Sequence, residues 1–216
     1  MRIISVNISS GKTVQWHDRK IRTGIFKEPV TDRVAVHLLN IQGDKQSDLR
    51  VHGGADKAIY SYDHEDYLYW NRALGRELQS GAFGENLTTE GILDRHVHVG
   101  DIFRAGTAIL QAVQPRLPCF KLGIKFADDQ MPDRFMTAER WGIYFRVLEE
   151  GTVAAGDAVE ILKRDTNHVR IADLPRILSD DMVDEDLIRR ALAIQAMPVG
   201  WRNKIIRLAK QSGIQA

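Results

Sequence analysis

The sequence feature that most constrains this chain is residues 114–122, QPRLPCFKL, which hold the only cysteine among 216 residues. An apolar run at 108–113 precedes the stretch and predicts a buried strand. Each proline fixes its own φ and biases the residue before it toward extended conformations, so the strand cannot continue. We therefore expect a stiff, extended approach that presents Cys119 where a strand gives way to a helix.

A cysteine in that setting supports more than one chemistry. Its thiolate can act as a nucleophile, a redox centre or a ligand for a soft metal. A free cysteine is also among the most buried residue types, so Cys119 fits equally well as a small core residue. The stretch by itself leaves these alternatives open.

Charge and cysteine content narrow the class of protein. The formal net charge is +1, so no overall field attracts nucleic acid or an anionic membrane, and local basic residues have to build any anion site. A single cysteine excludes an internal disulfide and a self-contained four-cysteine cluster. The first residues alternate as a strand without a signal-peptide core, and no apolar run is long enough to cross a bilayer. We expect a cytoplasmic protein with no membrane segment.

Short strands account for most of the chain. Alternating apolar residues predict several strands within residues 1–62, including a segment at 20–26 that bends at Gly24. Residues 97–113 have the tight turns of a meander, and residues 141–148 return to a strand pattern. The sequence contains neither a Rossmann fingerprint nor a P-loop.

Helical spacing interrupts the strands in two places. One helix is capped by Asp63 and stops at Gly81, and a second occupies residues 131–141. Many short strands with few βαβ repeats favour a fold that is mostly β with α, built on an antiparallel β-barrel.

The composition changes after residue 165. From residue 171 the spacing predicts three short helices, the second capped by Asp184 and the third beginning at Pro198. Helices this short are not stable alone, so they must pack on one another or on the barrel. We therefore divide the chain into a barrel domain, residues 1–165, and a three-helix domain, residues 166–216.

A pair of glycines at 53–54 marks a possible anion site. Paired glycines allow positive φ and close backbone approach, and Arg50, His52 and Lys57 flank them here. The segment is either a cradle for a phosphate or a polar turn between two strands.

A second glycine-rich turn, GAFGENLTT at 81–89, opens into a polar strand. Asn86 and Thr88 alternate with Leu87, so one face of this strand offers hydrogen-bonding groups. That face points either to solvent or to a ligand.

These segments together resemble the MOSC family, named for the carboxyl-terminal domain of molybdenum cofactor sulfurases, and more narrowly its YiiM branch. The resemblance rests on HGGADKA at 52–58, FGENLT at 83–88, QPRLPCFKL at 114–122 and the three-helix tail. It implies a β-barrel protein that binds the molybdenum cofactor (molybdopterin) and reduces N-hydroxylated compounds. YiiM-like proteins are associated with resistance to N-hydroxylated base analogues such as 6-hydroxylaminopurine.

The resemblance also implies a site. Cys119 would be the catalytic cysteine and the protein ligand of molybdenum, which suits a soft thiolate. Four local cations would neutralise the phosphate of the pterin: Arg50, His52, Lys57 and Arg116. Asn86 and Thr88 would form hydrogen bonds with the pterin. With one cysteine and no nucleotide fingerprint, the chain needs an external flavin or iron–sulfur reductase as its electron donor.

Three other functions compete with this one. Cys119 could carry a persulfide in a non-catalytic carrier of cofactor or sulfur. It could act in a cysteine hydrolase with His52 or His64 as base, although no spacing suggests a third orienting group. The tail could bind nucleic acid, but its basic residues alternate with apolar ones as a solvated helix face does: Arg202, Lys204, Arg207 and Lys210.

Overall fold

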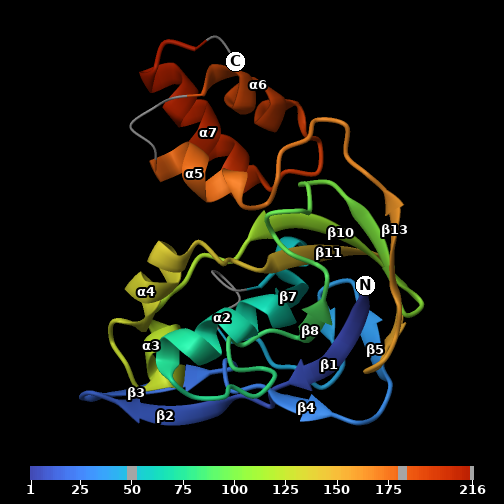
Figure 1. Cartoon of the computed structure of the whole chain (residues 1–216), viewed down its shortest axis with the longest axis vertical. Coiled ribbons are helices and arrows are strands. Elements are labelled where there is room, and N and C mark those ends of the chain that lie inside the picture. The colour runs from blue at the N-terminus through green and yellow to red at the C-terminus, as the bar shows by residue number, and fades with distance from the viewer. Residues whose placement is uncertain (48–52, 180–183, 215–216) are drawn as a thin grey trace.

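The largest element of the fold is a sheet of eight strands (Figure 1). The computed structural model describes residues 1–47, 53–179 and 184–214. The strands lie in the order β13 (Val159–Lys163), β9 (Ile102–Ala105), β10 (Ala108–Pro115), β11 (Ile143–Glu149), β7 (Ile59–Asp63), β8 (Leu87–Glu90), β1 (Arg2–Ile8) and β4 (Glu28–Val30). Most residues of β10 are buried, as its apolar run predicted.

The sheet is mixed and open, which corrects the predicted antiparallel barrel. β7 and β8 run parallel, because helix α2 (His64–Leu74) connects them and a parallel pair requires such a crossover. The strand order ends at β13 and β4, although an isolated bridge between Arg2 and Ala158 brings the start of β1 beside β13. In the described part of the chain this bridge does not extend into a ladder, so the sheet curls without closing.

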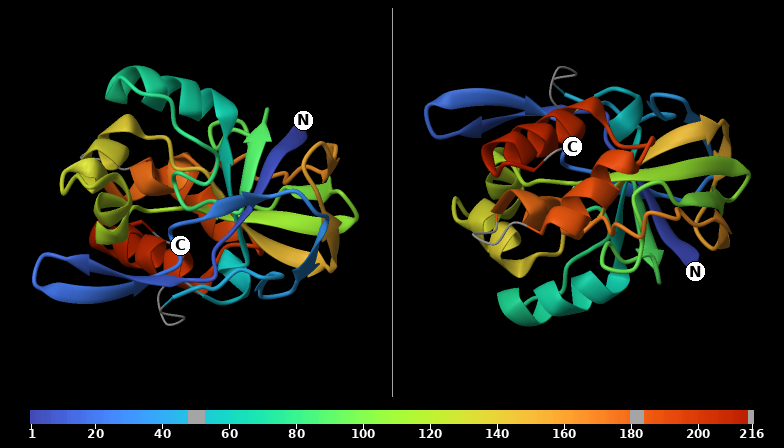
Figure 2. Two further views of the ribbon diagram at one scale, coloured as in Figure 1. Left: turned by 90° about the horizontal axis from the view of Figure 1, so that it is seen from below. Right: turned by 90° about the horizontal axis from the view of Figure 1, so that it is seen from above.

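Two smaller sheets flank the large one. The first has three strands: β12 (Gly151–Val153), β5 (Val34–His37) and β6 (Asn40–Ile41). The second is a ribbon of β2 (Lys12–Trp16) and β3 (Arg19–Thr23), which extends from the body of the molecule (Figure 2). The strand expected at 20–26 ends at Thr23. Gly24 allows the chain to turn there, since a Cβ at Gly24 would lie 2.1 Å from the carbonyl oxygen of Lys45.

Helix α2 begins as the sequence predicted and ends earlier. The side chain of Asp63 accepts a hydrogen bond from the amide of Glu65, which confirms the N-cap. The helix stops at Leu74, because Gly75 adopts the left-handed conformation of a C-cap, with φ 62°. The expected stop at Gly81 is therefore wrong by about two turns, and residues between the two glycines form no further helix.

Helices α3 (Phe120–Phe126) and α4 (Met131–Ala138) lie close to α2 and share an aromatic cluster with it. The rings of Tyr62 and Phe83 approach to 4.4 Å between centroids. The cluster also contains Tyr60, Tyr67, Trp70, Phe126, Phe135 and Trp141. The aromatic residues of α2 are thus core residues, as their spacing predicted, and the cluster forms a rigid support for the segment that carries Cys119.

The tail contains the three helices that the sequence predicted. They are α5 (Asp173–Ser179), α6 (Glu185–Ala193) and α7 (Val199–Gln211), and Figure 1 shows them stacked at one end of the large sheet. Asp184 caps α6 by accepting a hydrogen bond from the amide of Leu187, and Pro198 stands at the N-cap of α7.

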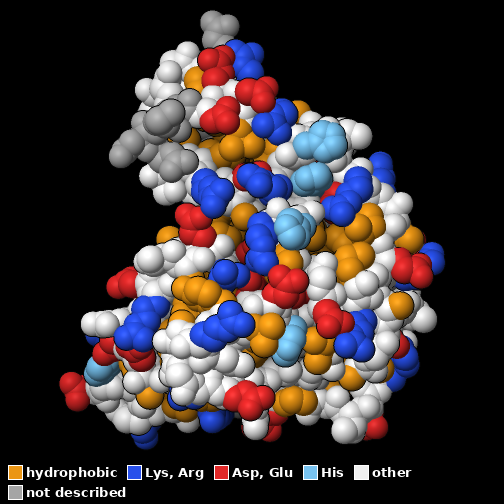
Figure 3. All heavy atoms as spheres, viewed as in Figure 1, with side chains coloured by type: hydrophobic (Ala, Val, Ile, Leu, Met, Phe, Trp, Pro, Cys, Tyr) orange, Lys and Arg blue, Asp and Glu red, His pale blue; other side chains and the backbone are white. Residues whose placement is uncertain are grey.

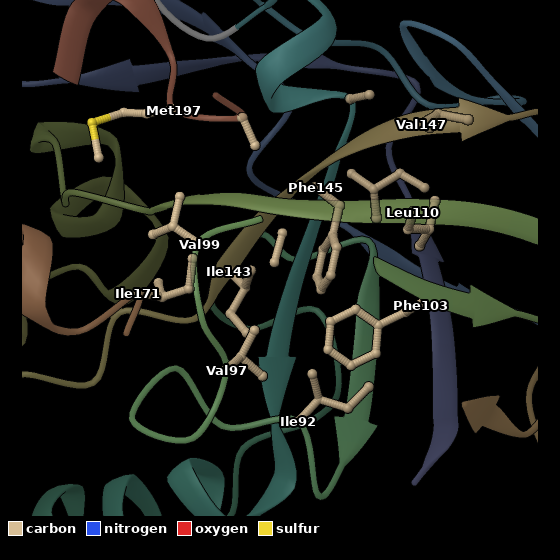
Figure 4. Close-up of a cluster of buried hydrophobic side chains, with 14 of the residues drawn as sticks. Ile92, Val97, Val99, Phe103, Leu110, Ile143, Phe145, Val147, Ile171 and Met197 are labelled. Atoms are coloured by element: carbon tan, nitrogen blue, oxygen red, sulfur yellow. The ribbon is translucent and has the colours of Figure 1, made fainter. Parts of the chain in front are cut away.

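The tail and the sheet share one hydrophobic core. Ile171 and Met197 of the tail belong to the same buried cluster as Phe103 and Phe145 of the sheet (Figure 4). Trp201 of α7 also donates from Nε1 to Oε1 of Gln114 on β10, at 3.0 Å. The tail therefore docks on the residue where the cysteine stretch begins. The division into two domains at residue 165 stays a prediction.

Among the helices of the described ranges, none combines the length and the apolar character that spanning a membrane would require.

Candidate functional site

The cysteine stretch adopts the conformation that its prolines predicted. β10 ends at Pro115, and the chain continues without regular structure to Cys119, which precedes the first residue of α3. Cys119 itself is extended, with φ −137° and ψ 168°, and is partly buried. The expectation of an extended approach that presents the cysteine between strand and helix is confirmed.

Cys119 lines a surface pocket formed by six segments that are distant in the sequence, which we call the cysteine pocket. One wall comes from the end of β3 and the loop after it, and another from residues 44–47. The remaining residues come from β7, from the turn before β8, from β11 and from the cysteine stretch. The side chains that the argument uses are Lys27, Asp44, Lys45, Lys57, Tyr60, Asn86, Arg116, Cys119, Lys121 and Tyr144.

The cysteine pocket is strongly cationic. Among the described residues that line it are four lysines and one arginine, against the single carboxylate of Asp44. Asp44 is already neutralised, because Nζ of Lys27 lies 2.5 Å from each of its oxygens. Burial lowers the pKa of Lys27 and opposes this ion pair. The remaining cations leave a pocket suited to an anion.

Arg116 is the group in this pocket whose hydrogen bonding is incomplete. Its side chain is 93% removed from solvent, since only 7% of the residue is exposed, and Nη1 has no hydrogen-bond partner among the described residues. The guanidinium lies over the rings of Tyr60 and Phe135, 5.3 and 5.5 Å from their centroids. A buried cation without an anionic partner is costly, so the arrangement favours a bound anion.

Burial also sets the charge of the other titratable groups. It raises the pKa of Tyr60 and of Tyr144, and the nearby guanidinium of Arg116 opposes that rise. Both phenols are therefore neutral at physiological pH. Burial lowers the pKa of Lys57, and the positive charge of Lys204 lowers it further, while Asp56 and Cys119 raise it.

The structure brings together four of the predicted site residues: Lys57, Asn86, Arg116 and Cys119. The side chain of Asn86 is already bonded within the protein, because Oδ1 accepts from the amide of Tyr60 and Nδ2 donates to Asp44. Its contribution is to fix one wall of the pocket.

Thr88 is the one further predicted residue within the described ranges, and it does not join them. Thr88 does not line the cysteine pocket; its hydroxyl donates to Glu85 at 2.7 Å and accepts from Nδ2 of Asn7 at 3.1 Å. Its alternation with Leu87 marked a polar face correctly, but protein groups occupy that face. Arg50 and His52 lie outside the described residues.

Sequence reasoning missed several residues that line the pocket, among them Lys27, Asp44 and Lys45. Lys121 stands two positions after Cys119, so the same motif could have indicated it. In the sequence, Tyr60 and Tyr144 look like ordinary aromatic residues of strands. They meet only because β7 pairs with β11, which places the two residues opposite each other with ring centroids 5.1 Å apart.

The structure adds little support for the hydrolase and nucleic-acid-binding alternatives. His64, a candidate base for Cys119, is exposed at the first residue of α2 and does not line the cysteine pocket. Arg202, one of the basic residues of the tail, donates to the carbonyl oxygens of Leu192 and Ile194 and so joins α7 to the end of α6.

Arginines also gather where the tail meets the rest of the molecule, on the face drawn in Figure 3. They are paired with carboxylates. Arg95 and Arg140 both contact the buried Asp66, and Arg176 donates to Glu139. This group therefore holds the tail, α2 and the end of α4 together.

Comparisons with known proteins find relatives over nearly the whole chain. The sequence model of the MOSC domain matches residues 48–160. The chain is 38% identical to the uncharacterized protein YflK of Bacillus subtilis, over 95% of this chain and 93% of YflK. It is 32% identical to protein YiiM of Escherichia coli, over 91% of this chain and 88% of YiiM. A protein of Gibberella moniliformis named reductase is 30% identical over 78% of this chain, a match that spans 31% of the longer protein.

Solved structures agree with the sequence relatives. The crystal structure of YiiM from Geobacillus stearothermophilus matches with a TM-score of 0.79 at 32% identity, over 96% of this chain and 98% of that chain. The crystal structure of YiiM from Escherichia coli matches with a TM-score of 0.76 at 26% identity, over 100% of this chain and 96% of that chain.

Proposed function

This chain belongs to the MOSC domain family, and on that premise we propose that it binds a molybdenum cofactor in the cysteine pocket and reduces N-hydroxylated compounds. The substrate class we propose is N-hydroxylated purines and related base analogues, such as 6-hydroxylaminopurine. The reductase name of one relative supports a reductive activity.

The observation that carries the proposal is the buried guanidinium of Arg116 in the same pocket as the only cysteine. Its unpartnered Nη1 suits a phosphate oxygen, and the ammonium groups of Lys57 and Lys121 line the same pocket. A cofactor that carries both a phosphate and a thiophilic metal suits this combination of donors. The residues that line the pocket therefore fit the molybdenum cofactor.

Each residue has a separate task in this proposal. Cys119 provides a thiolate ligand for the metal, and the cofactor supplies the two-electron chemistry when it is bound. Arg116 and Lys57 hold the phosphate. Asp44 and Asn86 keep Lys27 and the amide of Tyr60 in place, so that the wall of the pocket does not collapse onto the site.

The reaction breaks one N–O bond. A hydroxylamino group takes up two electrons and two protons and yields an amino group and water. The sequence contains one cysteine and no nucleotide-binding fingerprint, so we propose that a separate flavin or iron–sulfur protein supplies the electrons.

Metal and pterin analysis tests the proposal. The protein is purified from cells that make the cofactor, and molybdenum and pterin are measured against protein concentration. We expect near-equimolar amounts of both, and reduction of 6-hydroxylaminopurine when a chemical reductant is supplied. Molybdenum-free protein with sulfane sulfur on Cys119 and full biological activity would overturn the proposal in favour of a persulfide carrier.

A further inference from the structure

Three lysines outside the cysteine pocket lie close to residues that line it or that directly follow its lining residues. Lys12 and Lys125 both lie over the ring of Phe26, with Nζ 3.8 and 5.1 Å from its centroid, and Phe26 directly follows pocket residues. Lys204 on α7 is close enough to Lys57 that its charge lowers the pKa of that residue. We call Lys12, Lys125 and Lys204 the lysine rim. None of the three lines the pocket itself.

Two exposed apolar side chains stand beside Cys119, close to the start of the helix that carries Lys125. Leu117 and Phe120 flank Cys119 on either side in the sequence, and 38% and 54% of their surfaces are exposed. An exposed Phe beside a redox cysteine has no role in the core, since Phe126, on the same helix, is the one that joins the aromatic cluster. The surface thus has an apolar centre and a cationic edge, the usual anatomy of a protein interface.

Acidic residues near the rim do not cancel its charge. Glu85 and Glu28 both act on Lys125, but Glu85 is fully buried and already accepts four hydrogen bonds, and Glu28 is exposed. Asp56, next to Lys57, receives a hydrogen bond from Nε of Arg146 at 2.8 Å. Asp44 is occupied by Lys27. The net field at the opening is positive, although the chain as a whole carries only +1.

We propose that Leu117, Phe120 and the lysine rim form the docking surface for a small acidic electron-carrier protein. The proposal rests on the proposed reductase function and adds to it the place where electrons enter. Rim charges steer a transient partner, and the apolar centre excludes water where the carrier's cofactor approaches Cys119. Two reduced carriers dock in turn and each delivers one electron. Solvent supplies two protons, the N–O bond breaks and water leaves.

Charge reversal tests this surface, with a reduced flavodoxin as the acidic probe. The variants are Lys12→Glu and Lys204→Glu, singly and together, and Lys163→Glu is the control, because Lys163 is an exposed lysine at the end of β13. We measure the equilibrium Kd for flavodoxin at low and high salt. We expect the double variant to raise Kd about tenfold at low salt, with a smaller effect at high salt, and the control to leave it unchanged.

Activity provides the second readout. The kcat/KM for flavodoxin should fall with the same ranking as binding, while activity with reduced methyl viologen, which needs no docking surface, stays at the wild-type level. If the wild-type holoprotein shows no activity with reduced methyl viologen, the reductase function is overturned. The Kd measurements would still test the docking surface in that case. An unchanged Kd in the double variant, an equal rise in Lys163→Glu, or equally tight binding of a short single-stranded oligonucleotide would overturn the docking surface.

Discussion

Glu85 and Arg116 are both buried charged side chains, but only Glu85 has its hydrogen bonding completed within the protein. Glu85 is fully buried and accepts four hydrogen bonds, from the hydroxyls of Tyr67 and Thr88 and from two amides of its own turn. Arg116 is nearly as buried, yet its Nη1 has no partner among the described residues. Buried polar groups are normally satisfied, so the first arrangement is that of a structural residue, and the second leaves a donor that a ligand could satisfy.

The comparison shows what a shared motif does not reveal. Both residues belong to segments that carry the family resemblance, FGENLT and QPRLPCFKL. The first segment builds a turn in which protein donors satisfy the buried carboxylate of Glu85. The second leads into a pocket in which Nη1 of Arg116 has no hydrogen-bond partner among the described residues. The following experiments test this contrast, from the largest expected effect to the smallest.

Removal of the thiol should have the largest effect on function. Cys119→Ala should lower reductase activity more than about 100-fold, since even residues that only support a metal ligand change activity by about 10–100-fold. The melting temperature should change little, because Cys119 is only partly buried. Steady-state kinetics and a thermal melt of the same preparation check this. Full activity in the variant would contradict every redox function proposed for Cys119, whether as a metal ligand or as a persulfide carrier.

Removal of Glu85 should damage stability instead of chemistry. Glu85→Ala leaves four donors without an acceptor, and at about 1 kcal/mol for each we expect a loss of about 4 kcal/mol in the free energy of unfolding. Urea denaturation measures it. A loss below about 1 kcal/mol would mean that water or other groups satisfy these donors, and the contrast with Arg116 would disappear.

Arg116→Ala should weaken cofactor binding and leave stability almost unchanged. We expect about a tenfold fall in affinity for the cofactor, equal to about 1.4 kcal/mol, typical for one charge-assisted hydrogen bond. Arg140→Ala is the control, because Arg140 is partly buried and, although its Nε has no hydrogen-bond partner among the described residues, its guanidinium is paired with Asp66 outside the cysteine pocket. It should lower stability and leave molybdenum content unchanged. Equal molybdenum content in both variants would contradict a phosphate site at Arg116.

The smallest effect concerns pH. Burial raises the pKa of Glu85 above its ordinary 4.5, although its hydrogen bonds oppose this. An acid with a raised folded-state pKa contributes stability that is fully present below the unfolded pKa and is lost as pH rises through the folded pKa. The free energy of unfolding should therefore fall as pH rises above about 4.5, and Glu85→Gln should show a shallower fall. Urea titrations at several pH values compare the two slopes.

Local sequence signals predicted much of the scaffold. Asp63 and Asp184 cap their helices as expected, the three tail helices are present, and the prolines before Cys119 end β10. These features depend on neighbours within a few residues, so the sequence displays them directly. The family resemblance likewise rests on contiguous segments. The stop of α2 was missed because the chain offers two glycines, and the first, Gly75, already adopts the left-handed C-cap conformation.

The sequence by itself determined where the chain turns, where its helices begin and that it carries a single thiol. Tertiary structure alone decided that β7 and β8 run parallel, that Tyr60 and Tyr144 face each other, and that Thr88 donates a hydrogen bond to Glu85. It also decided that Arg116 is buried without a complete set of partners. The physical reason is that strand pairing and burial join residues far apart in the chain, and whether a charge is satisfied depends on which of them arrive beside it.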